Sequence, residues 1–557
     1  MRWHPGRYPL SLAVIGMLVL AFLVVANLAA IEFGPLRTQA IAVDELYFAV
    51  CAARGNAIGE FPVFGCHDTK TPLIYAMHQL VQYAAGLYSL DGIKVAAYCM
   101  IGIGAALIAW LTHRLGGLLG AVAAAALFLL TVGTDAFLFA LKSEVLGSAF
   151  VLVGLLVLTL RRDAPVVRDW FLCGICFGLA FMVKQTFAFA VLAVLVVSFI
   201  APARNTAAST SRSGLSNVVA MSVGSAIPVL AFGLLFALQG RGAEYLASTF
   251  LYPGIYDSPA GESGLRRLLW RIGGVLQDMG RTPLVVMLAA LVLPTAFRRS
   301  SPQDTPQTAA KWQLQALVAC TLGMLLIVFV SPIYFDYHLL PAWVLLSVMG
   351  GLAVERAAVA VKLIGPAAAW GMALALLIPA AMMAAASWYS SGGKSKLVNR
   401  APPQPTVTGA KGEYGYVLGM WPQFYFSSGL VPATTVLFPW ALPGTPKNWA
   451  FVPPDPSTLK GRWLTAMQSL GSEQLMQDFA KTPPSYIVVS HEMARAAGSP
   501  RVTDVIALDD YLRDHCSYLG PAPVNLGSPQ SLSGCNARRG ESPGRADAQP
   551  GSPPALR

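Results

Sequence analysis

The sequence predicts an α-helical polytopic membrane protein of about eleven transmembrane helices, with a small C-terminal extracytoplasmic α/β domain. Three observations predict this fold class. Hydrophobic residues make up 55% of the 557 residues, charged residues only 12%, and the mean hydropathy is +0.57. Apolar runs of roughly 20 residues, the length that crosses about 30 Å of hydrocarbon, recur along most of the chain. The composition then becomes polar after about residue 390.

Composition and charge exclude several classes of protein. Soluble domains carry about twice this share of charged residues, so the chain is not a cytosolic, fibrous or disordered protein. The formal net charge of +11 is interpreted as a signal of membrane topology. No Lys/Arg-rich run with interleaved aromatic residues indicates a nucleic-acid groove, so we expect no nucleic-acid partner.

The apolar runs define the predicted spans. The first, Tyr8–Ala30, follows Arg2 and Arg7 and is longer than the apolar core of a signal peptide, so we expect a retained anchor with a cytoplasmic amino end. Further runs lie at 92–112, 116–133, 144–160, 170–187, 188–202, 217–238, 283–297, 312–330, 338–354 and 363–387. Positive residues fall in alternate connecting segments, as the positive-inside rule requires of cytoplasmic loops. They are His113, Arg114, Arg161, Arg162, Arg168, Arg204, Arg212, Arg298, Arg299, Lys311, Arg356 and Lys362.

An odd number of spans leaves three long segments outside the cytoplasm, and loops of such length are usually functional. We expect a transmembrane domain over 1–390, with outward loops at 31–90 and 239–282. A linker is expected over 391–412, an extracytoplasmic α/β domain over 413–535, and a disordered tail over 536–557, which is rich in Gly, Pro, Arg and Ser.

Patterns within the tail indicate alternating strands and helices. Strands are predicted at Tyr416–Met420 and Tyr486–Ser490, and helices at Pro422–Ser428, Ser472–Lys481 and Leu508–His515.

Cysteine positions agree with this orientation. Cys51 and Cys66 share the first outward loop, and Cys516 and Cys535 share the tail. Each pair is interpreted either as a disulfide in an oxidising compartment or as free thiols.

Two adjacent carboxylates, Asp44 and Glu45, stand in an otherwise apolar stretch shortly after the first span. One of them can act as a general base for a hydroxyl group. The alternative is a helix N-terminus that favours acidic side chains through its dipole.

Positive charge is expected near these carboxylates. Lys70 precedes Thr71, Pro72 and an amphipathic helix, and can present its ammonium to a phosphate at headgroup depth. The alternative is an interfacial lysine paired with Asp68. Lys184 lies between apolar runs, where isolated charge is costly, so a binding role is favoured.

Other ionisable candidates lie at the outward ends of spans: Lys142, Glu144, Tyr337 and His338. Their alternatives are interfacial anchors and a hydrogen-bonded aromatic belt. In the second loop, Arg241, Arg266, Arg267 and Arg271 are interpreted as surface charge, with phosphate contact as the alternative.

The order of these motifs and their side of the membrane resemble the GT-C superfamily of membrane glycosyltransferases. The resemblance is to bacterial family 39-like and aminoarabinose-transferase-like enzymes, relatives of the protein O-mannosyltransferases. The first motif is Asp44-Glu45, and the second is Lys70-Thr71-Pro72-Leu73-Ile74-Tyr75, which is similar to the family's Lys-Pro-Pro-Leu-x-Tyr. The third is Lys142-Ser143-Glu144, which is similar to the family's Arg-x-Glu. The remaining motifs are Lys184, at the end of Leu-Ala-Phe-Met-Val-Lys, and Tyr337-His338-Leu339-Leu340-Pro341. Thr71 departs from the family's proline, and Lys142 from its arginine.

The resemblance implies transfer of a hexose or pentose from a polyprenyl-phosphate donor to a lipid, glycan or protein acceptor. It implies the bacterial inner membrane, a cytoplasmic N-terminus and a periplasmic C-terminal domain. Asp44 would be the general base with Glu45 as its neighbour or substitute, and Lys70 and then Lys184 would bind the donor phosphate. A single displacement would invert the anomeric configuration. No metal ligands and no cofactor are assigned, and a requirement for a divalent metal stays open.

Two other functions stay open. A transporter or flippase of a lipid-linked saccharide would show inverted repeats and broken spans, and no convincing repeat is seen. A non-catalytic envelope-assembly subunit would hold partners through the tail.

Overall fold

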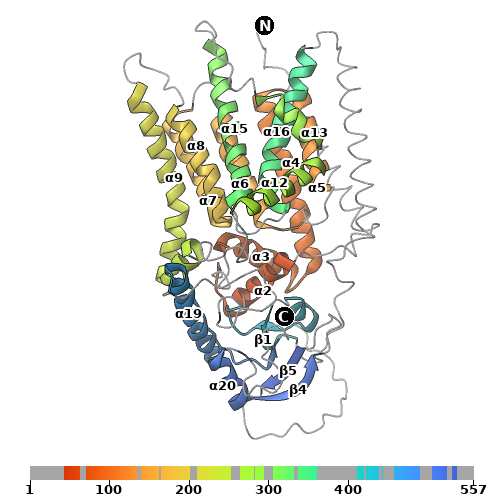
Figure 1. Ribbon diagram of the computed structural model, residues 1–557, viewed down its shortest axis with the longest axis vertical. Coiled ribbons are helices and arrows are strands. Elements are labelled where there is room, and N and C mark those ends of the chain that lie inside the picture. The colour runs from red at the N-terminus through yellow and green to blue at the C-terminus, as the bar shows by residue number, and fades with distance from the viewer. Residues whose placement is uncertain are drawn as a thin grey trace.

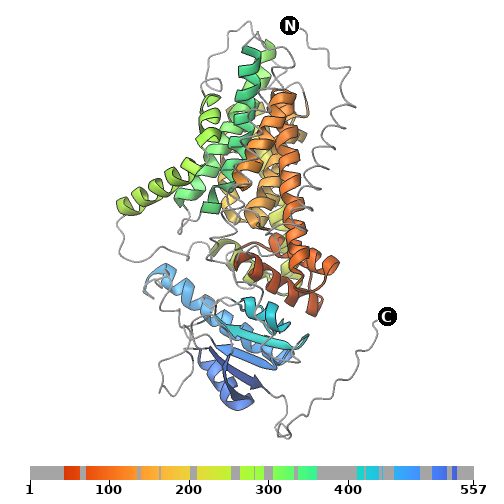
Figure 2. The same cartoon turned by 90° about the vertical axis from the view of Figure 1, so that its right-hand side faces the viewer.

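The computed structural model has three layers along its long axis, which are a helix bundle, a layer of short helices and a mixed sheet (Figures 1 and 2). It describes residues 43–62, 70–133, 140–161, 165–200, 210–251, 264–281, 283–293, 305–330, 336–360, 411–419, 422–437, 442, 457–489, 503, 505–522 and 530–535. The predicted first and last spans, most of the predicted linker and the predicted disordered tail lie outside these residues.

The bundle contains nine of the described helices, and each overlaps a predicted apolar run. They are α4 (Leu90–Leu115), α5 (Leu118–Gly133), α6 (Ser143–Thr159), α7 (Val167–Val183), α8 (Ala188–Ile200), α9 (Thr210–Leu238), α13 (Pro283–Ala290), α15 (Thr305–Val330) and α16 (Leu340–Ala360). Within the described part of the chain, four segments are long and apolar enough to cross a membrane: Leu90–Leu115, Gly214–Leu238, Trp312–Phe329 and Tyr337–Ala357. The chain is therefore a multi-pass membrane protein, and the total of eleven spans stays a prediction.

Two helices end earlier than the apolar pattern predicts. α7 stops at Val183 because Lys184 has an extended backbone and separates it from the short helix η3 (Gln185–Phe187). The predicted span 170–187 thus ends before its lysine. α13 ends at Ala290, whereas the predicted span continued to residue 297, and a turn follows at Leu291 and Val292.

Glycines allow the backbones of α7 and α9 to touch. A Cβ built on Gly224 would lie 2.2 Å from the carbonyl oxygen of Phe171, and one on Gly174 would lie 2.3 Å from that of Met221. Close approach through small residues is a common way for helices to pack in a membrane.

The predicted outward loops are largely helical and form the middle layer. It contains α2 (Val43–Ile58), α3 (Pro72–Ala85), α10 (Gly242–Leu246), the π-helix η4 (Ala247–Leu251), α12 (Gly264–Arg281) and η5 (Asp336–Leu339). α2 packs against α3, and Gln82 Nε2 of α3 donates a 2.6 Å hydrogen bond to the carbonyl of Ala49 in α2. Cys51 is disulfide-bonded, whereas its predicted partner Cys66 lies outside the described residues.

The tail folds into a five-stranded mixed sheet with three described helices. The strands are β1 (Tyr414–Leu418), β2 (Val431–Pro432), β3 (Tyr486–Val489), β4 (Cys516–Ala522) and β5 (Gln530–Cys535), in the order β2-β1-β3-β5-β4. β1 is parallel to β2 and β3, whereas β5 is antiparallel to β3 and β4. The helices are α18 (Pro422–Ser428), α19 (Leu459–Lys481) and α20 (Ile506–His515).

The elements predicted in the tail are present at slightly shifted bounds, whereas β2, β4, β5 and the first half of α19 were not predicted. β4 and β5 are rich in Ser, Gly and Pro and lack a clear alternation, so their pairing depends on neighbouring strands. A disulfide joins Cys516 to Cys535, and the free-thiol interpretation of that pair is wrong.

The tail docks on the α2–α3 layer through side chains of that layer. Tyr47 donates a 3.2 Å hydrogen bond to the carbonyl of Gly419, and Tyr88 donates a 2.7 Å bond to that of Leu430. The guanidinium carbon of Arg54 lies 5.5 Å from the centre of the Tyr414 ring. Burial lowers the pKa of Arg54, although Asp478 and Glu60 act in the opposite direction.

Candidate functional site

The adjacent carboxylates at the start of α2 have different surroundings. Consecutive helical residues diverge by about 100°, so the two side chains face different neighbours. Glu45 is fully buried, ion-pairs with Lys94 at 3.1 Å and accepts a hydrogen bond from the backbone N–H of Leu141. Asp44 is half-buried, and its negative charge acts on the ammonium of Lys184. It makes no hydrogen bond or ion pair with another residue of the described chain.

The segment before α6 is fixed from two sides at Leu141. Its N–H donates to Glu45, and its carbonyl lies 3.1 Å from Nε2 of the fully buried His78 on α3. Burial lowers the pKa of His78 to about 4, so the ring is neutral and Nε2–H is the donor. These contacts place Lys142 and Glu144 at the end of the bundle that faces α2 and α3.

Two of the predicted lysines lie against the aromatic ring of a third predicted residue, Tyr337. Lys142, the residue before α6, has its Nζ 3.7 Å from the centre of the Tyr337 ring, and Lys184 Nζ lies 5.7 Å from the same centre. Both are cation–π contacts. Lys184 also forms a buried ion pair with Glu144, in the first turn of α6. Two lysines that are distant in sequence therefore lie near the same residue of η5.

Lys70 and His338 complete the cluster. Thr71, the N-cap of α3, donates a 3.2 Å hydrogen bond to the carbonyl of Phe181 and so ties the start of α3 to α7. This contact keeps the half-buried Lys70 close enough for its charge to act on Lys184 and on His338. His338 also interacts electrostatically with Lys142, Lys184 and Glu144.

The polar cluster therefore contains Asp44, Lys70, Lys142, Glu144, Lys184, Tyr337 and His338. Seven of the eight predicted site residues belong to it, and Glu45 lies beside it with its carboxylate engaged elsewhere. Three ammonium groups outnumber the two carboxylates, and Asp44 is half-buried. Chemically, such a site can attract an anion and accept a proton next to it.

Sequence reasoning missed the residues that hold the cluster in place, which are Lys94, Thr71 and His78. Of these three, Lys94 could most easily have been identified from the sequence, because a lone lysine at the edge of an apolar run indicates a charged partner. Within the described residues, no group of three or more His, Cys, Asp or Glu side chains is arranged to hold a metal ion.

Two arginines of the second loop are not the surface charges that the sequence predicted. Arg241 ion-pairs with Glu60 and, at 2.8 Å, with Glu244, so it joins the first outward loop to the second. Arg271 is buried and donates to the carbonyl of Phe329 at the end of α15. Arg266 is exposed, as expected.

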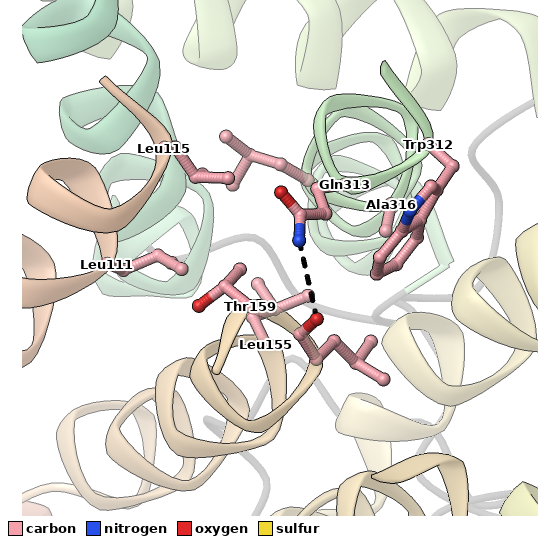
Figure 3. A pocket seen from close by; sticks show the side chains of 9 residues that line it. Leu111, Leu115, Leu155, Thr159, Trp312, Gln313 and Ala316 are labelled. Carbon is pink, nitrogen blue, oxygen red and sulfur yellow. Dashed lines mark hydrogen bonds between the residues drawn. The ribbon is translucent and has the colours of Figure 1, made fainter. Parts of the chain in front are cut away.

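A small apolar pocket lies in the bundle at the end away from the sheet (Figure 3). It is lined by the C-terminal parts of α4 and α6 and the N-terminal part of α15, where Gln313 Nε2 lies 3.5 Å from the carbonyl oxygen of Leu158. Its volume of about 10 Å³ suits at most a single water molecule. The polar cluster, not this pocket, is therefore the candidate site.

No model of a known protein family and no curated protein matches the sequence. Solved structures nevertheless share its fold. The crystal structure of ArnT from Cupriavidus metallidurans bound to undecaprenyl phosphate matches with a TM-score of 0.56 and 13% identity, over 94% of this chain and 98% of that one. The apo form of the same enzyme matches with the same TM-score and 14% identity.

A second kind of protein has a similar fold. The apo crystal structure of the Archaeoglobus fulgidus oligosaccharyltransferase matches with a TM-score of 0.50 and 15% identity, over 88% of this chain and 70% of that one. Both proteins are GT-C glycosyltransferases. The chain thus has the GT-C fold, and the resemblance noted in the sequence is confirmed at the level of the fold.

Proposed function

We propose that this chain is a membrane glycosyltransferase that transfers a sugar from a polyprenyl-phosphate donor to an acceptor hydroxyl or amine. One observation carries the proposal: the half-buried Asp44 lies within electrostatic range of Lys184, which belongs to a cluster of lysines at one end of the bundle. The GT-C fold supports the same function. The acceptor would be a lipid, a glycan or a protein.

Asp44 is the general base of the proposed reaction. It takes the proton from the acceptor as the acceptor oxygen or nitrogen attacks the anomeric carbon. The bond between that carbon and the phosphate oxygen breaks, and its electron pair leaves with the polyprenyl phosphate. One displacement on one face of the sugar inverts the configuration at the anomeric carbon.

Lys70, Lys142 and Lys184 stabilise the charge that develops on the leaving phosphate. Fixed positive groups in a water-poor site are effective here because they need no reorganisation during the reaction. Glu144 keeps Lys184 in place through their buried ion pair. Lys142 and Lys184 are further aligned by the ring of Tyr337.

Glu45 acts as a positioning residue in this proposal. Its carboxylate is held by Lys94 and by the N–H of Leu141, the residue before Lys142. It therefore fixes the phosphate-binding end of α6 relative to the helix that carries Asp44.

The orientation of the protein completes the proposal. The polar cluster and the sheet lie toward the same end of the molecule, which we assign to the periplasmic side of a bacterial inner membrane, with the N-terminus in the cytoplasm (Figure 2). The disulfide between Cys516 and Cys535 supports this side, because disulfides persist in oxidising compartments.

Asp44→Asn tests the base. The variant keeps the shape of the side chain but accepts no proton at neutral pH, so transfer of label from a radiolabelled polyprenyl-phosphate sugar should fall by about 10²- to 10⁴-fold. Asp91→Asn, which changes an exposed carboxylate in the first turn of α4, is the matched control and should keep wild-type activity. Retained transfer in Asp44→Asn would remove this residue from the mechanism.

Lys70→Ala tests the phosphate contact. Loss of a charged hydrogen bond of about 1.5–3 kcal/mol should weaken donor binding by about 10- to 100-fold. Donor affinity is measured by calorimetry with purified protein, and Lys70→Arg should recover part of it. Unchanged affinity in Lys70→Ala would exclude the contact.

A transport assay with the wild-type protein tests the alternative function. Movement of intact donor across vesicle membranes without sugar transfer would indicate a flippase.

A further inference from the structure

Helix α12 carries apolar side chains that the rest of the protein leaves uncovered. Within its 18 residues, Leu265 is 67% exposed, Leu269 59% and Leu276 62%, and Leu268 and Ile272 are also exposed. A helix that belonged to a soluble layer would bury such residues. Their exposure requires a covering that the described chain does not provide.

The exposed residues form one continuous stripe. At about 100° per residue, Leu265, Leu268, Leu269, Ile272 and Leu276 fall within an arc of about 100°. The opposite half of the helix carries Arg, Trp, Gly, Gln and one Asp in the sequence; Arg266 and Trp270 are exposed there, and Gly273 is exposed at its edge. The helix is thus amphipathic along its whole length.

A third face of α12 attaches it to the protein. Arg271, Val275 and Asp278 are buried, and they are spaced one turn apart on one side of the helix. Arg271 donates to the carbonyl of Phe329, and α12 packs on α15 and on η5. This packing face lies about 110° from the centre of the apolar stripe, so the bundle is beside the stripe and does not cover it.

The position of α12 fits the boundary of a membrane. It crosses the end of the bundle that carries the polar cluster and projects from its side, as the light green helix of Figure 2 shows. Pro283 of α13 follows two residues after its end. The exposed leucines of α15, Leu322 and Leu326, lead toward Phe329 and hence to α12. α12 is therefore packed on a membrane-spanning helix that itself exposes apolar side chains.

We propose that α12 is an in-plane membrane helix whose apolar stripe lies in the lipid leaflet nearest the polar cluster. Its occupant is phospholipid: the acyl-chain boundary covers the stripe, and the exposed Arg266 faces the headgroups. Amphipathic helices with basic polar faces bind membranes in this way. Apart from the buried Arg271 and Asp278, the sequence of α12 carries three arginines and no acidic residue, which also favours anionic headgroups. This inference does not depend on the proposed sugar transfer.

Site-directed fluorescence tests the lipid contact. Single cysteines are introduced as Leu276→Cys on the stripe and Gly273→Cys outside it, in a Cys99→Ser background that removes the exposed native thiol. A Cβ at Gly273 has no atom within 4 Å, so this matched control is free of steric strain. The full chain is labelled with an environment-sensitive dye and reconstituted in vesicles of ordinary or brominated phosphatidylcholine and phosphatidylglycerol.

We expect brominated lipid to reduce the emission of the dye at position 276 by about twofold or more, and to leave the dye at 273 nearly unchanged, because bromine quenches only within the acyl region. Leu265→Cys repeats the measurement at the other end of the stripe. The proposal is overturned if the dye at position 276 stays unquenched. This holds both when its emission indicates contact with water and when it indicates contact with a protein partner. Equal quenching at 273 and 276 would overturn the in-plane orientation.

Discussion

At the scale of single residues, neighbours in the sequence have separate roles. Asp44 and Glu45 are adjacent acidic residues on one helix, yet the charge of Asp44 acts on Lys184, whereas Glu45 is bound by Lys94 and Leu141. The pattern of two carboxylates predicted a functional pair. Only the folded surroundings distinguish the half-buried Asp44 from the fully buried Glu45, whose carboxylate is bound by Lys94 and by the N–H of Leu141.

His78 should make the stability of the protein depend on pH. Its pKa is about 4 when folded and about 6.5 when exposed. The folded state disfavours the proton, so the stabilisation is complete above pH 6.5 and is lost as the pH falls toward 4. The expected loss is about 2 kcal/mol at pH 5. Thermal unfolding of the purified protein between pH 7.5 and 5 measures it.

His78→Gln is the control for this effect. Its amide can still donate to the carbonyl of Leu141 but does not titrate, so the variant should lose less stability between pH 7.5 and 5 than the wild type does. The same pH dependence in both proteins would show that another group is responsible.

At the scale of elements, the apolar pattern predicts the bundle helices because a lipid-facing or buried helix must be apolar over its whole length. The pattern does not predict which helices touch. The contact between α7 and α9 depends on Gly174 and Gly224, whose hydrogens face the opposing backbone. The broken junction at Lys184 likewise depends on a partner, Glu144, from another helix.

Gly224→Ala should destabilise the bundle. Its new methyl group would meet the carbonyl oxygen of Phe171 at 2.2 Å, so α7 and α9 must separate. Overpacking of this kind costs about 1–3 kcal/mol, which a lower thermal midpoint in detergent would report. Gly273→Ala, on the exposed side of α12, adds a methyl group in open space and should leave the midpoint unchanged or raise it. Equal effects of the two substitutions would contradict the close contact.

At the scale of the whole molecule, the polar cluster is assembled where five separate segments end. Asp44 comes from α2, Lys70 from the start of α3, Lys142 and Glu144 from α6, Lys184 from the end of α7, and Tyr337 and His338 from η5. The tail docks on the same layer through Tyr47 and Tyr88. The polar cluster therefore lies at the end of the bundle on which the sheet docks.

The orientation of this assembly leads to a test with fusions. Because the positive residues predict a cytoplasmic N-terminus and an odd number of spans, alkaline phosphatase fused after residue 557 should be active in bacteria. A fluorescent protein that folds only in the cytoplasm should stay dark at the same position. The reverse pair of results would place the cluster and the sheet in the cytoplasm and contradict the proposed side.

The sequence by itself determined the class of protein and most of the bundle helices, and it singled out as candidates the seven residues that the fold brings together in the polar cluster. These follow from the energetics of single segments. Helices in lipid must be apolar, and a charged residue near lipid is costly unless it has a partner. Only the tertiary structure decided that Glu45 supports the site, that Leu141 is held by Glu45 and His78, and that the stripe of α12 is uncovered. Each of these depends on contacts between segments far apart in the chain, and such contacts leave no local pattern.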